Sequence, residues 1–123
     1  MGLTFSEKVI SSKLGEEKKA GEFAFVPVSK LMANELSGFV SIKQFEKYGF
    51  CEVFDPDNIF LIPSHNVPTK DVTTSIHAKT LKDFAKKYNI KHYYELGEMG
   101  IEHALLPEKR LIFPGDLVVG GDS

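Results

Sequence analysis

Two histidines of this sequence occupy positions suited to proton transfer. His65 comes shortly after the apolar run 59–62, and His103 follows a glycine-flanked turn at 97–100. Histidine titrates near neutral pH, so it can hold or release a proton under physiological conditions. Because chemistry in α/β folds gathers where strands end, polar residues directly after an apolar run are candidates for a site.

An aspartate and a serine follow the apolar run 117–119. Gly120 and Gly121 separate this predicted strand from Asp122 and Ser123. A glycine pair allows a sharp turn or a close approach of the backbone to a ligand. Asp and Ser are also ordinary turn residues, so a strand followed by a plain turn remains an alternative interpretation.

The other histidines and the single cysteine carry less functional weight. His77 and His92 lie among polar neighbours, and we expect both to be solvated. We expect Cys51 to be a small, half-buried residue. One cysteine excludes an internal disulfide and cannot by itself hold an iron–sulfur cluster.

Helical and extended patterns alternate along the chain and would position these side chains. Thr4 and Glu7 form a possible capping box for a first helix, and Asp71 is available to cap the clearest amphipathic helix. The expected helices cover residues 4–14, 39–48 and 71–88, and the expected strands cover 23–28, 59–62, 90–96, 111–113 and 117–119.

This alternation predicts an α/β fold: a three-layer α/β/α arrangement with a mainly parallel sheet, formed by residues 1–123 as one segment. A hydrophobic content of 42%, a charged content of 26% and a net charge of -2 describe an ordinary globular protein. They do not favour a nucleic-acid or membrane partner. We expect a cytoplasmic location.

Four motifs together resemble the N-terminal part of large subunits in the aconitase superfamily, of the 3-isopropylmalate dehydratase and archaeal-type homoaconitase kind. They are MGLTFSEKVISSKLG, PVSKLMANELSG, PSHNVPTKD and GEMGIEHALLPEKRLIFPGDLVVGGDS, in the order in which the family has them. The resemblance implies a segment of the aconitase-type iron–sulfur domain. It also leads us to expect that the chain is the N-terminal piece of a longer protein.

The resemblance implies roles for five residues. His65 would serve in acid–base chemistry on the substrate hydroxyl that leaves as water, and His103 and Asp122 match a catalytic histidine–aspartate pair. Asn34 and Ser123 match positions that contact the substrate. The family has aspartate immediately before the histidine, whereas this chain has Ser64. We therefore expect the carboxylate that would orient the His65 imidazole to be missing.

The implied activity is a hydro-lyase reaction that isomerises a hydroxy acid by dehydration and rehydration. The resemblance implies a [4Fe-4S] cluster in the full-length protein, with its cysteine ligands outside this chain, and no cluster on the chain itself. It also implies a small-subunit partner, in a heterodimer or heterotetramer. The alternative is a non-catalytic α/β module that acts through protein contacts, which Ser64 favours.

Overall fold

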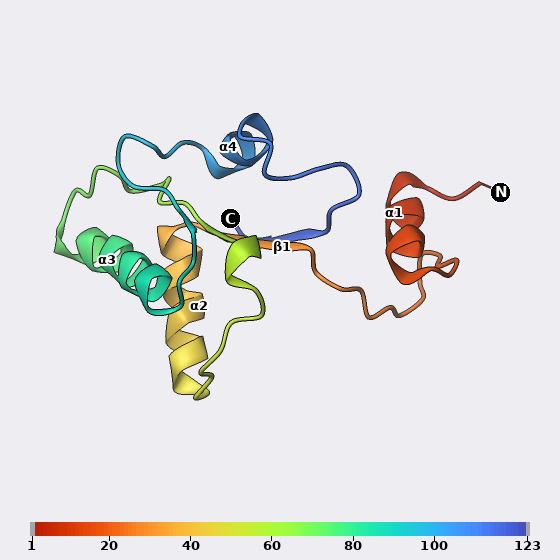
Figure 1. Cartoon of the computed structure of the whole chain (residues 1–123), viewed down its shortest axis with the longest axis horizontal. Helices are drawn as coiled ribbons and strands as arrows, with labels where there is room; N and C mark the ends of the chain where they lie inside the picture. Colours follow the sequence, from red (N-terminus) through yellow and green to blue (C-terminus); the bar gives the residue numbers. More distant parts are fainter. Residues whose placement is uncertain (1, 123) are drawn as a thin grey trace.

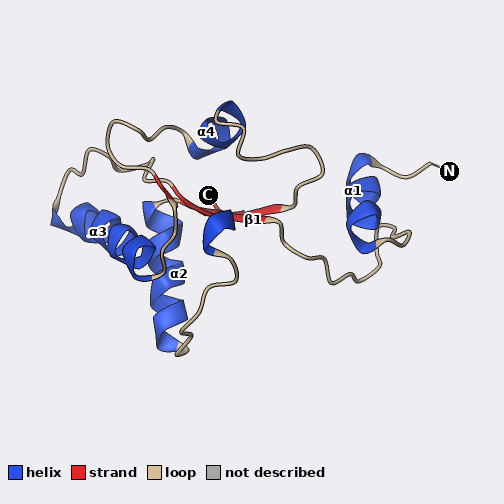
Figure 2. Ribbon diagram, in the orientation of Figure 1, coloured by secondary structure: helices blue, strands red, loops and turns tan. Residues whose placement is uncertain are grey.

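A computed structural model describes residues 2–122. Figure 1 shows the chain from red to blue, and Figure 2 separates helices from strands. In chain order the elements are α1 (Phe5–Leu14), β1 (Lys30–Ala33), α2 (Glu35–Lys47), the 3-10 turn η1 (Pro56–Asn58), β2 (Ile59–Leu61), α3 (Val72–Lys87), β3 (His92–Tyr93), α4 (Glu102–Glu108) and β4 (Val118–Gly121).

The four strands form one parallel sheet in the order β3-β2-β1-β4. Helices α2 and α3 cover one face and α4 covers the other, so the sheet is the middle of three layers (Figure 1). This confirms the predicted α/β class with a parallel sheet. Because every strand runs the same way, the carboxyl ends of β1, β2 and β4 lie at one edge.

Each face of the sheet has its own apolar core. Toward α2 and α3, the buried residues are Ala33, Ile42, Ile59, Leu61, Leu81, Ala85 and Ile90. Toward α4, they are Phe60, Ile62, Leu105 and Leu106. Side chains along β2 and at the next residue alternate between the two cores: Ile59 and Leu61 enter the first, and Phe60 and Ile62 enter the second. A strand covered on both faces requires this alternation.

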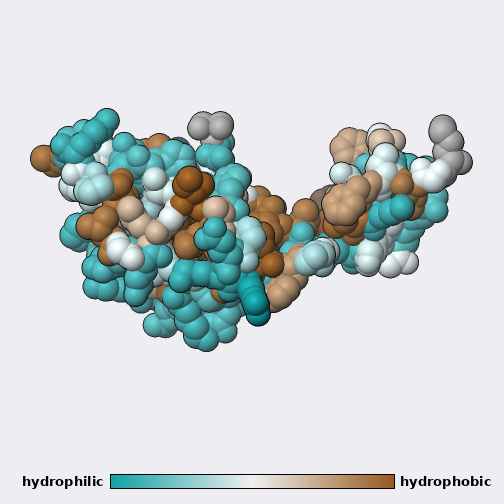
Figure 3. Space-filling view, turned by 90° about the horizontal axis from the view of Figure 1, so that it is seen from above, coloured by the Kyte–Doolittle hydropathy of each residue, from teal (hydrophilic) through white to brown (hydrophobic). Residues whose placement is uncertain are grey.

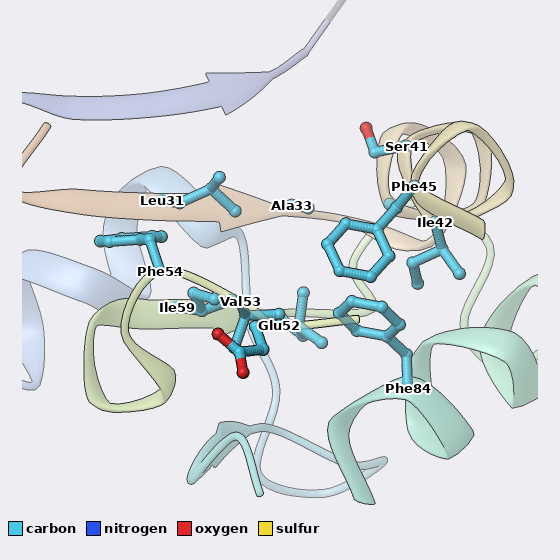
Figure 4. A pocket seen from close by; sticks show the side chains of 12 residues that line it. Leu31, Ala33, Ser41, Ile42, Phe45, Glu52, Val53, Phe54, Ile59 and Phe84 are labelled. Carbon is cyan, nitrogen blue, oxygen red and sulfur yellow. The ribbon is translucent and has the colours of Figure 1, made fainter. Parts of the chain in front are cut away.

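An apolar cavity of about 180 Å³ remains between α2, α3 and the sheet (Figure 4). Phe45 and Phe84 line it side by side and contact each other edge to face, with ring centroids 5.4 Å apart. Side chains of Leu31, Val53 and Ile59 contribute to the rest of its wall. Its lining includes Ala33 and Leu61, the last residues of β1 and β2, together with the partly exposed Phe54.

Side-chain caps define where three helices begin. Thr4, Asn34 and Asp71 each form a capping box at the first turn of α1, α2 and α3. The predicted helices at 4–14 and 71–88 are confirmed. The second helix begins at Glu35 and not at Phe39, because the Asn34 side chain accepts hydrogen bonds from the Leu36 and Ser37 N–H groups.

The strand predicted at 23–28 is wrong. Phe23 and Phe25 are each 99% exposed, and the first strand is Lys30–Ala33. Pro27 offers no N–H to a sheet ladder, which is the physical objection to a strand here. The third strand contains only His92 and Tyr93, and residues 111–113 form no strand.

Helix α4 was not expected from the sequence. It spans seven residues and contains Pro107. Two turns of helix are too short to show a clear apolar period, and a proline inside the segment argues against a helix. The helix nevertheless buries Leu105 and Leu106 against Phe60 and Ile62.

Helix α1 projects from the body of the molecule, and residues 15–29 connect it to β1 (Figure 1). We call residues 15–29 the N-terminal arm. In the space-filling view, brown apolar residues extend along the narrow part of the molecule between the body and the α1 lobe (Figure 3). None of the helices in residues 2–122 has the length and apolar character that crossing a membrane requires.

Candidate functional site at the carboxyl edge of the sheet

Four elements bring polar side chains to the edge where the strands end. Asn34 directly follows β1, and His65 lies in the loop that follows β2. His103 belongs to the first turn of α4, and Asp122 directly follows β4. Residues that are far apart in the sequence therefore meet at one edge, as the carboxyl ends of parallel strands require.

Asp122 lies between the two histidines. Its Oδ1 is 3.6 Å from Nε2 of His65, and its Oδ2 is 3.4 Å from Nε2 of His103. All three side chains are partly open to solvent, with exposed fractions of 37% for His65, 54% for His103 and 38% for Asp122. The arrangement places two imidazole rings, which can carry protons, beside one carboxylate.

The environment of His65 corrects the expectation that no carboxylate would face its imidazole. Ser64 does face the ring, with Oγ 2.9 Å from Nδ1. The carboxylate comes instead from Asp122, which approaches the opposite nitrogen of the ring. Both nitrogens of His65 therefore have a polar neighbour, although the residue before it is not an aspartate.

Asn34 lies beneath this cluster and is 2% exposed. Its Oδ1 accepts hydrogen bonds from the N–H groups of Leu36 and Ser37. Its Nδ2 donates to Oε1 of Glu102 at 3.2 Å and to the Gly121 carbonyl at 3.5 Å. Both amide hydrogens are thus engaged, so a direct bond from Asn34 to a substrate requires one of these bonds to be exchanged.

Two buried glutamates support the edge, and neither was expected from the sequence. Glu35 is 0% exposed and Glu102 is 2% exposed. Oε1 of Glu102 accepts from Asn34 and lies 3.8 Å from Nδ1 of His103. Its Oε2 is buried and has no hydrogen-bond partner among the described residues. Glutamate is rarely buried, so its type and position gave no signal of this role.

A cavity of about 440 Å³ opens beside His65 and Asp122. Its wall is polar at the strand ends, where Asn34 contributes beside His65 and Asp122, and along α2 it combines the apolar Leu36 and Val40 with serines. This is a space in which a small polar molecule could meet the histidine–aspartate cluster. Ser123, the fifth predicted site residue, lies outside the described residues.

Comparison with known proteins identifies the family of the chain. Residues 7–123 match the aconitase family (aconitate hydratase). The chain belongs to the aconitase family. This confirms the resemblance stated from the four motifs. The matched residues include all of the side chains that meet at the carboxyl edge.

Similar proteins include 3-isopropylmalate dehydratase large subunits from three bacteria. The chain is 50% identical over 123 residues to that of Thermoanaerobacter sp., 48% identical over 123 residues to that of Caldanaerobacter subterraneus and 46% identical over 124 residues to that of Thermodesulfovibrio yellowstonii. Each alignment covers 100% of this chain. The chain spans 29–30% of the length of these curated relatives.

Membership in the aconitase family implies an iron–sulfur cluster, but the residues of this chain do not fit as its ligands. Cys51 is the single cysteine. It follows the carboxyl end of α2, whereas Asn34 caps the amino end. A helix of 13 residues separates the two, which is roughly 20 Å at the rise of an α-helix. Cys51 therefore lies far from the carboxyl edge of this aconitase-family segment.

Three side chains at the edge have the spacing of a possible ion site. Glu102, His103 and Asp122 each offer a ligand atom, and these atoms lie within 4.8 Å of one another. One carboxylate oxygen of Glu102 is already bonded to Asn34. The imidazole and carboxylate atoms of this group can also carry protons.

Three other expectations need correction. Cys51 is exposed and not half-buried. His77 and His92 are half-buried and not solvated. His77 stacks on Phe39 at 4.2 Å and His92 stacks on Phe60 at 4.5 Å. Burial lowers the pKa of His92 below its ordinary value of 6.5. His77 lies on α3 and His92 on β3, and neither is among the side chains that meet at the carboxyl edge.

Proposed function

We propose that this chain supplies one wall of the active site of an aconitase-family hydro-lyase of the 3-isopropylmalate dehydratase type. The observation that carries the proposal is the convergence of His65, His103 and Asp122 from three separate elements at the carboxyl edge. The similar proteins are named as large subunits of this dehydratase. A small subunit would be the partner of the full-length protein, and a hydroxy acid such as isopropylmalate its substrate.

The chemistry assigned to the chain is proton transfer at the substrate hydroxyl. In this assignment His65 is the general acid: it donates its Nε2 proton to the hydroxyl oxygen as the carbon–oxygen bond breaks and water leaves. In the rehydration step, neutral His65 accepts a proton from the incoming water. His103 shares Asp122 and holds that carboxylate in place, with Glu102 behind it.

The remaining machinery belongs to other parts of the full-length protein in this proposal. The thiolates for an iron–sulfur cluster, the base that removes the proton from the neighbouring carbon and the groups that recognise the substrate carboxylates are assigned there. Asn34 and Ser123 are assigned substrate contacts, as the resemblance to the family implies. For Asn34 this means exchanging its bond to Glu102 or Gly121 when the substrate binds.

The test is turnover of isopropylmalate by the full-length protein carrying this segment, assembled with its small subunit. We expect His65→Asn to lower kcat by about 10²–10⁴-fold, the usual loss when a general acid is removed. The matched control is His77→Asn, which changes a half-buried histidine that stacks on Phe39, outside the cluster. That control should retain turnover within about threefold, since it removes no group that handles a proton of the reaction.

The alternative of a non-catalytic module makes the opposite prediction. If His65→Asn and His103→Asn both leave turnover unchanged, the edge cluster does not take part in the reaction. Ser64 no longer favours that alternative, because Asp122 supplies the carboxylate that its serine side chain lacks.

A further inference from the structure

The loop that carries His65 is held by a buried carboxylate from a different element. Glu35 is the first residue of α2 and is fully buried. Its Oε2 accepts a hydrogen bond from the Ser64 N–H at 2.8 Å, and its Oε1 accepts from the His65 N–H at 2.9 Å. Oε1 also accepts from the Asn66 N–H. Three consecutive backbone amides thus converge on one side chain.

These bonds explain how a carboxylate can be buried at this point. Burying an ionised carboxylate is costly unless it is hydrogen-bonded or paired. Among the described residues no lysine, arginine or histidine forms an ion pair with Glu35. The compensation comes from the three N–H donors and from the amino end of α2, where the helix dipole favours negative charge.

The same bonds decide where the His65 backbone lies. Residues 62–70 form no helix or strand, so the loop has no ladder to hold it. The contact of Ser64 with Nδ1 and the contact of Asp122 with Nε2 both depend on where the His65 backbone lies. We propose that Glu35 is the positioning residue of the site: its carboxylate fixes the Ser64–Asn66 backbone and thereby aligns His65 with Asp122 and the cavity.

A glutamine cannot replace this carboxylate. The three backbone N–H groups of Ser64, His65 and Asn66 all need an acceptor. A carboxylate has two acceptor oxygens, whereas the glutamine amide has one oxygen and one NH₂ group, which is a donor. In Glu35→Gln, an oxygen can still serve His65 and Asn66, but the NH₂ group then opposes the Ser64 N–H. Glu35→Asp keeps two acceptors on a shorter side chain, so it should restore part of the anchoring that glutamine loses.

This inference rests on the proposed function, because it assigns Glu35 a role through His65. In the assembled full-length enzyme we expect Glu35→Gln to lower kcat by about 10–100-fold, since a displacement of 1 Å can cost that much. KM for isopropylmalate should stay within about threefold, because the lost alignment acts at the chemical step. Glu35→Asp should fall between Glu35→Gln and the unmodified protein.

A second measurement on the same protein reads the loop directly. The peptide 63–68 begins and ends with proline, so its backbone amides are those of Ser64, His65, Asn66 and Val67. Three of these four donate to Glu35. Hydrogen exchange followed by mass spectrometry should show them exchanging at least about tenfold faster in Glu35→Gln. The control is Ile42→Val, which weakens the buried face of the same helix without touching the loop.

The outcomes separate this inference from the proposed function. Faster exchange of the loop with lower kcat in Glu35→Gln, and neither change in Ile42→Val, supports the inference. Unchanged exchange in Glu35→Gln overturns it. Faster exchange with normal kcat, while His65→Asn is inactive, overturns the positioning role and leaves the proposed function standing. Normal turnover in His65→Asn overturns both.

Discussion

The carboxyl edge and the N-terminal arm break the usual rule of burial in opposite directions. At the edge, polar side chains are inside: Asn34, Glu35 and Glu102 are at most 2% exposed. On the arm, aromatic side chains are outside: Phe23 and Phe25 are each 99% exposed. Most folded proteins show neither feature without a reason, because unpaired buried polar groups and exposed aromatic surface both cost free energy.

The two regions differ in whether contacts within the chain compensate for the unusual burial of these side chains. The side-chain oxygens of Asn34 and Glu35 accept hydrogen bonds from backbone N–H groups. The Asn34 side-chain nitrogen donates to Glu102 and to the Gly121 carbonyl. Except for Oε2 of Glu102, which has no partner among the described residues, the buried polar atoms of these three residues are hydrogen-bonded, as a pre-organised site needs. Phe23 and Phe25 have no comparable cover among the described residues.

The largest expected effect is at Asn34. Asn34→Ala removes the cap of α2 and leaves Glu102 without the bond at its buried Oε1. We expect the free energy of unfolding to fall by about 2–3 kcal/mol, about 1 from the cap and the rest from the unpaired polar groups. Urea denaturation followed by circular dichroism measures it.

The matched control is Thr4→Ala at α1, the helix that the N-terminal arm connects to β1. Thr4 caps α1 with the same kind of capping box, but α1 has no buried residues. Its loss should change the unfolding free energy of the body by less than about 0.5 kcal/mol. If the two variants lost equal free energy of unfolding, the burial of Asn34 at the carboxyl edge would add nothing to the stability that a helix cap provides.

The second effect concerns how tightly the edge is packed. A Cβ added at Gly121 would lie 2.7 Å from Cβ of Ser37 in the first turn of α2. Gly121→Ala should therefore cost about 1–2 kcal/mol, as small-to-large changes in packed regions do, and should move Asp122 away from the histidines. Thermal unfolding measures the first effect, and loss of turnover in the full-length protein the second.

Gly120→Ala is the neighbouring control. Its Cβ would meet Cγ of Met32 at 2.6 Å and the Met32 carbonyl oxygen at 3.2 Å; the flexible Met32 side chain can change rotamer, so only the milder contact with the carbonyl oxygen remains. A smaller cost is expected than for Gly121→Ala. If Gly120→Ala cost more than Gly121→Ala, the backbone of β4 would shift away from Ser37 more easily than the Met32 side chain changes rotamer.

The sequence predicted most of the edge and little of its support. His65 and Asp122 follow predicted strands, whose carboxyl ends meet at one edge, whereas His103 was paired with Asp122 only through the resemblance to the family. The apolar spacing of 71–88 and the cap at Asp71 identified α3. Glu35 and Glu102 could not be predicted. A buried glutamate depends on donors from other elements, and the Glu35 donors lie about 30 residues away in the chain.

The wrong expectations share a physical cause. The run 23–28 is apolar enough for a strand, but no layer of the described structure covers it. Helix α4 is short and holds Pro107, yet burial of Leu105 and Leu106 stabilises it. Tertiary contact, which a local pattern does not contain, decided both cases.

A smaller effect is expected from His92, which lies in β3, the outer strand of the sheet next to β2. It stacks on Phe60, its register partner in β2, and burial lowers its pKa below the ordinary 6.5. The unfolded chain therefore binds a proton that the folded chain does not as the pH falls below about 6.5. Stability should be complete above this pH and should decrease as the pH falls toward the lower folded-state pKa.

His92→Phe is the variant that isolates this contribution. It keeps an aromatic ring against Phe60 and removes the titrating group. We expect the urea midpoint of the variant to depend less on pH between about pH 7 and pH 5.5 than that of the unmodified chain. Identical slopes would show that His92 titrates alike in the folded and unfolded chain.

The smallest effect on folding is expected on the N-terminal arm, and it is the sharpest test of the comparison. Phe23→Ser combined with Phe25→Ser removes two aromatic rings that are almost fully exposed, so no buried apolar area is lost. The free energy of unfolding should change by less than about 0.5 kcal/mol, the usual range for surface substitutions. Binding of a hydrophobic dye should fall, because these rings form part of the exposed apolar surface. The reference is Phe60→Leu, which removes part of a ring that is 2% exposed and should cost more than 1 kcal/mol, roughly as for other large-to-small core changes. A loss of similar size in the arm variant would mean that Phe23 and Phe25 are covered in solution, and the contrast between a self-contained edge and an uncovered arm would then be wrong.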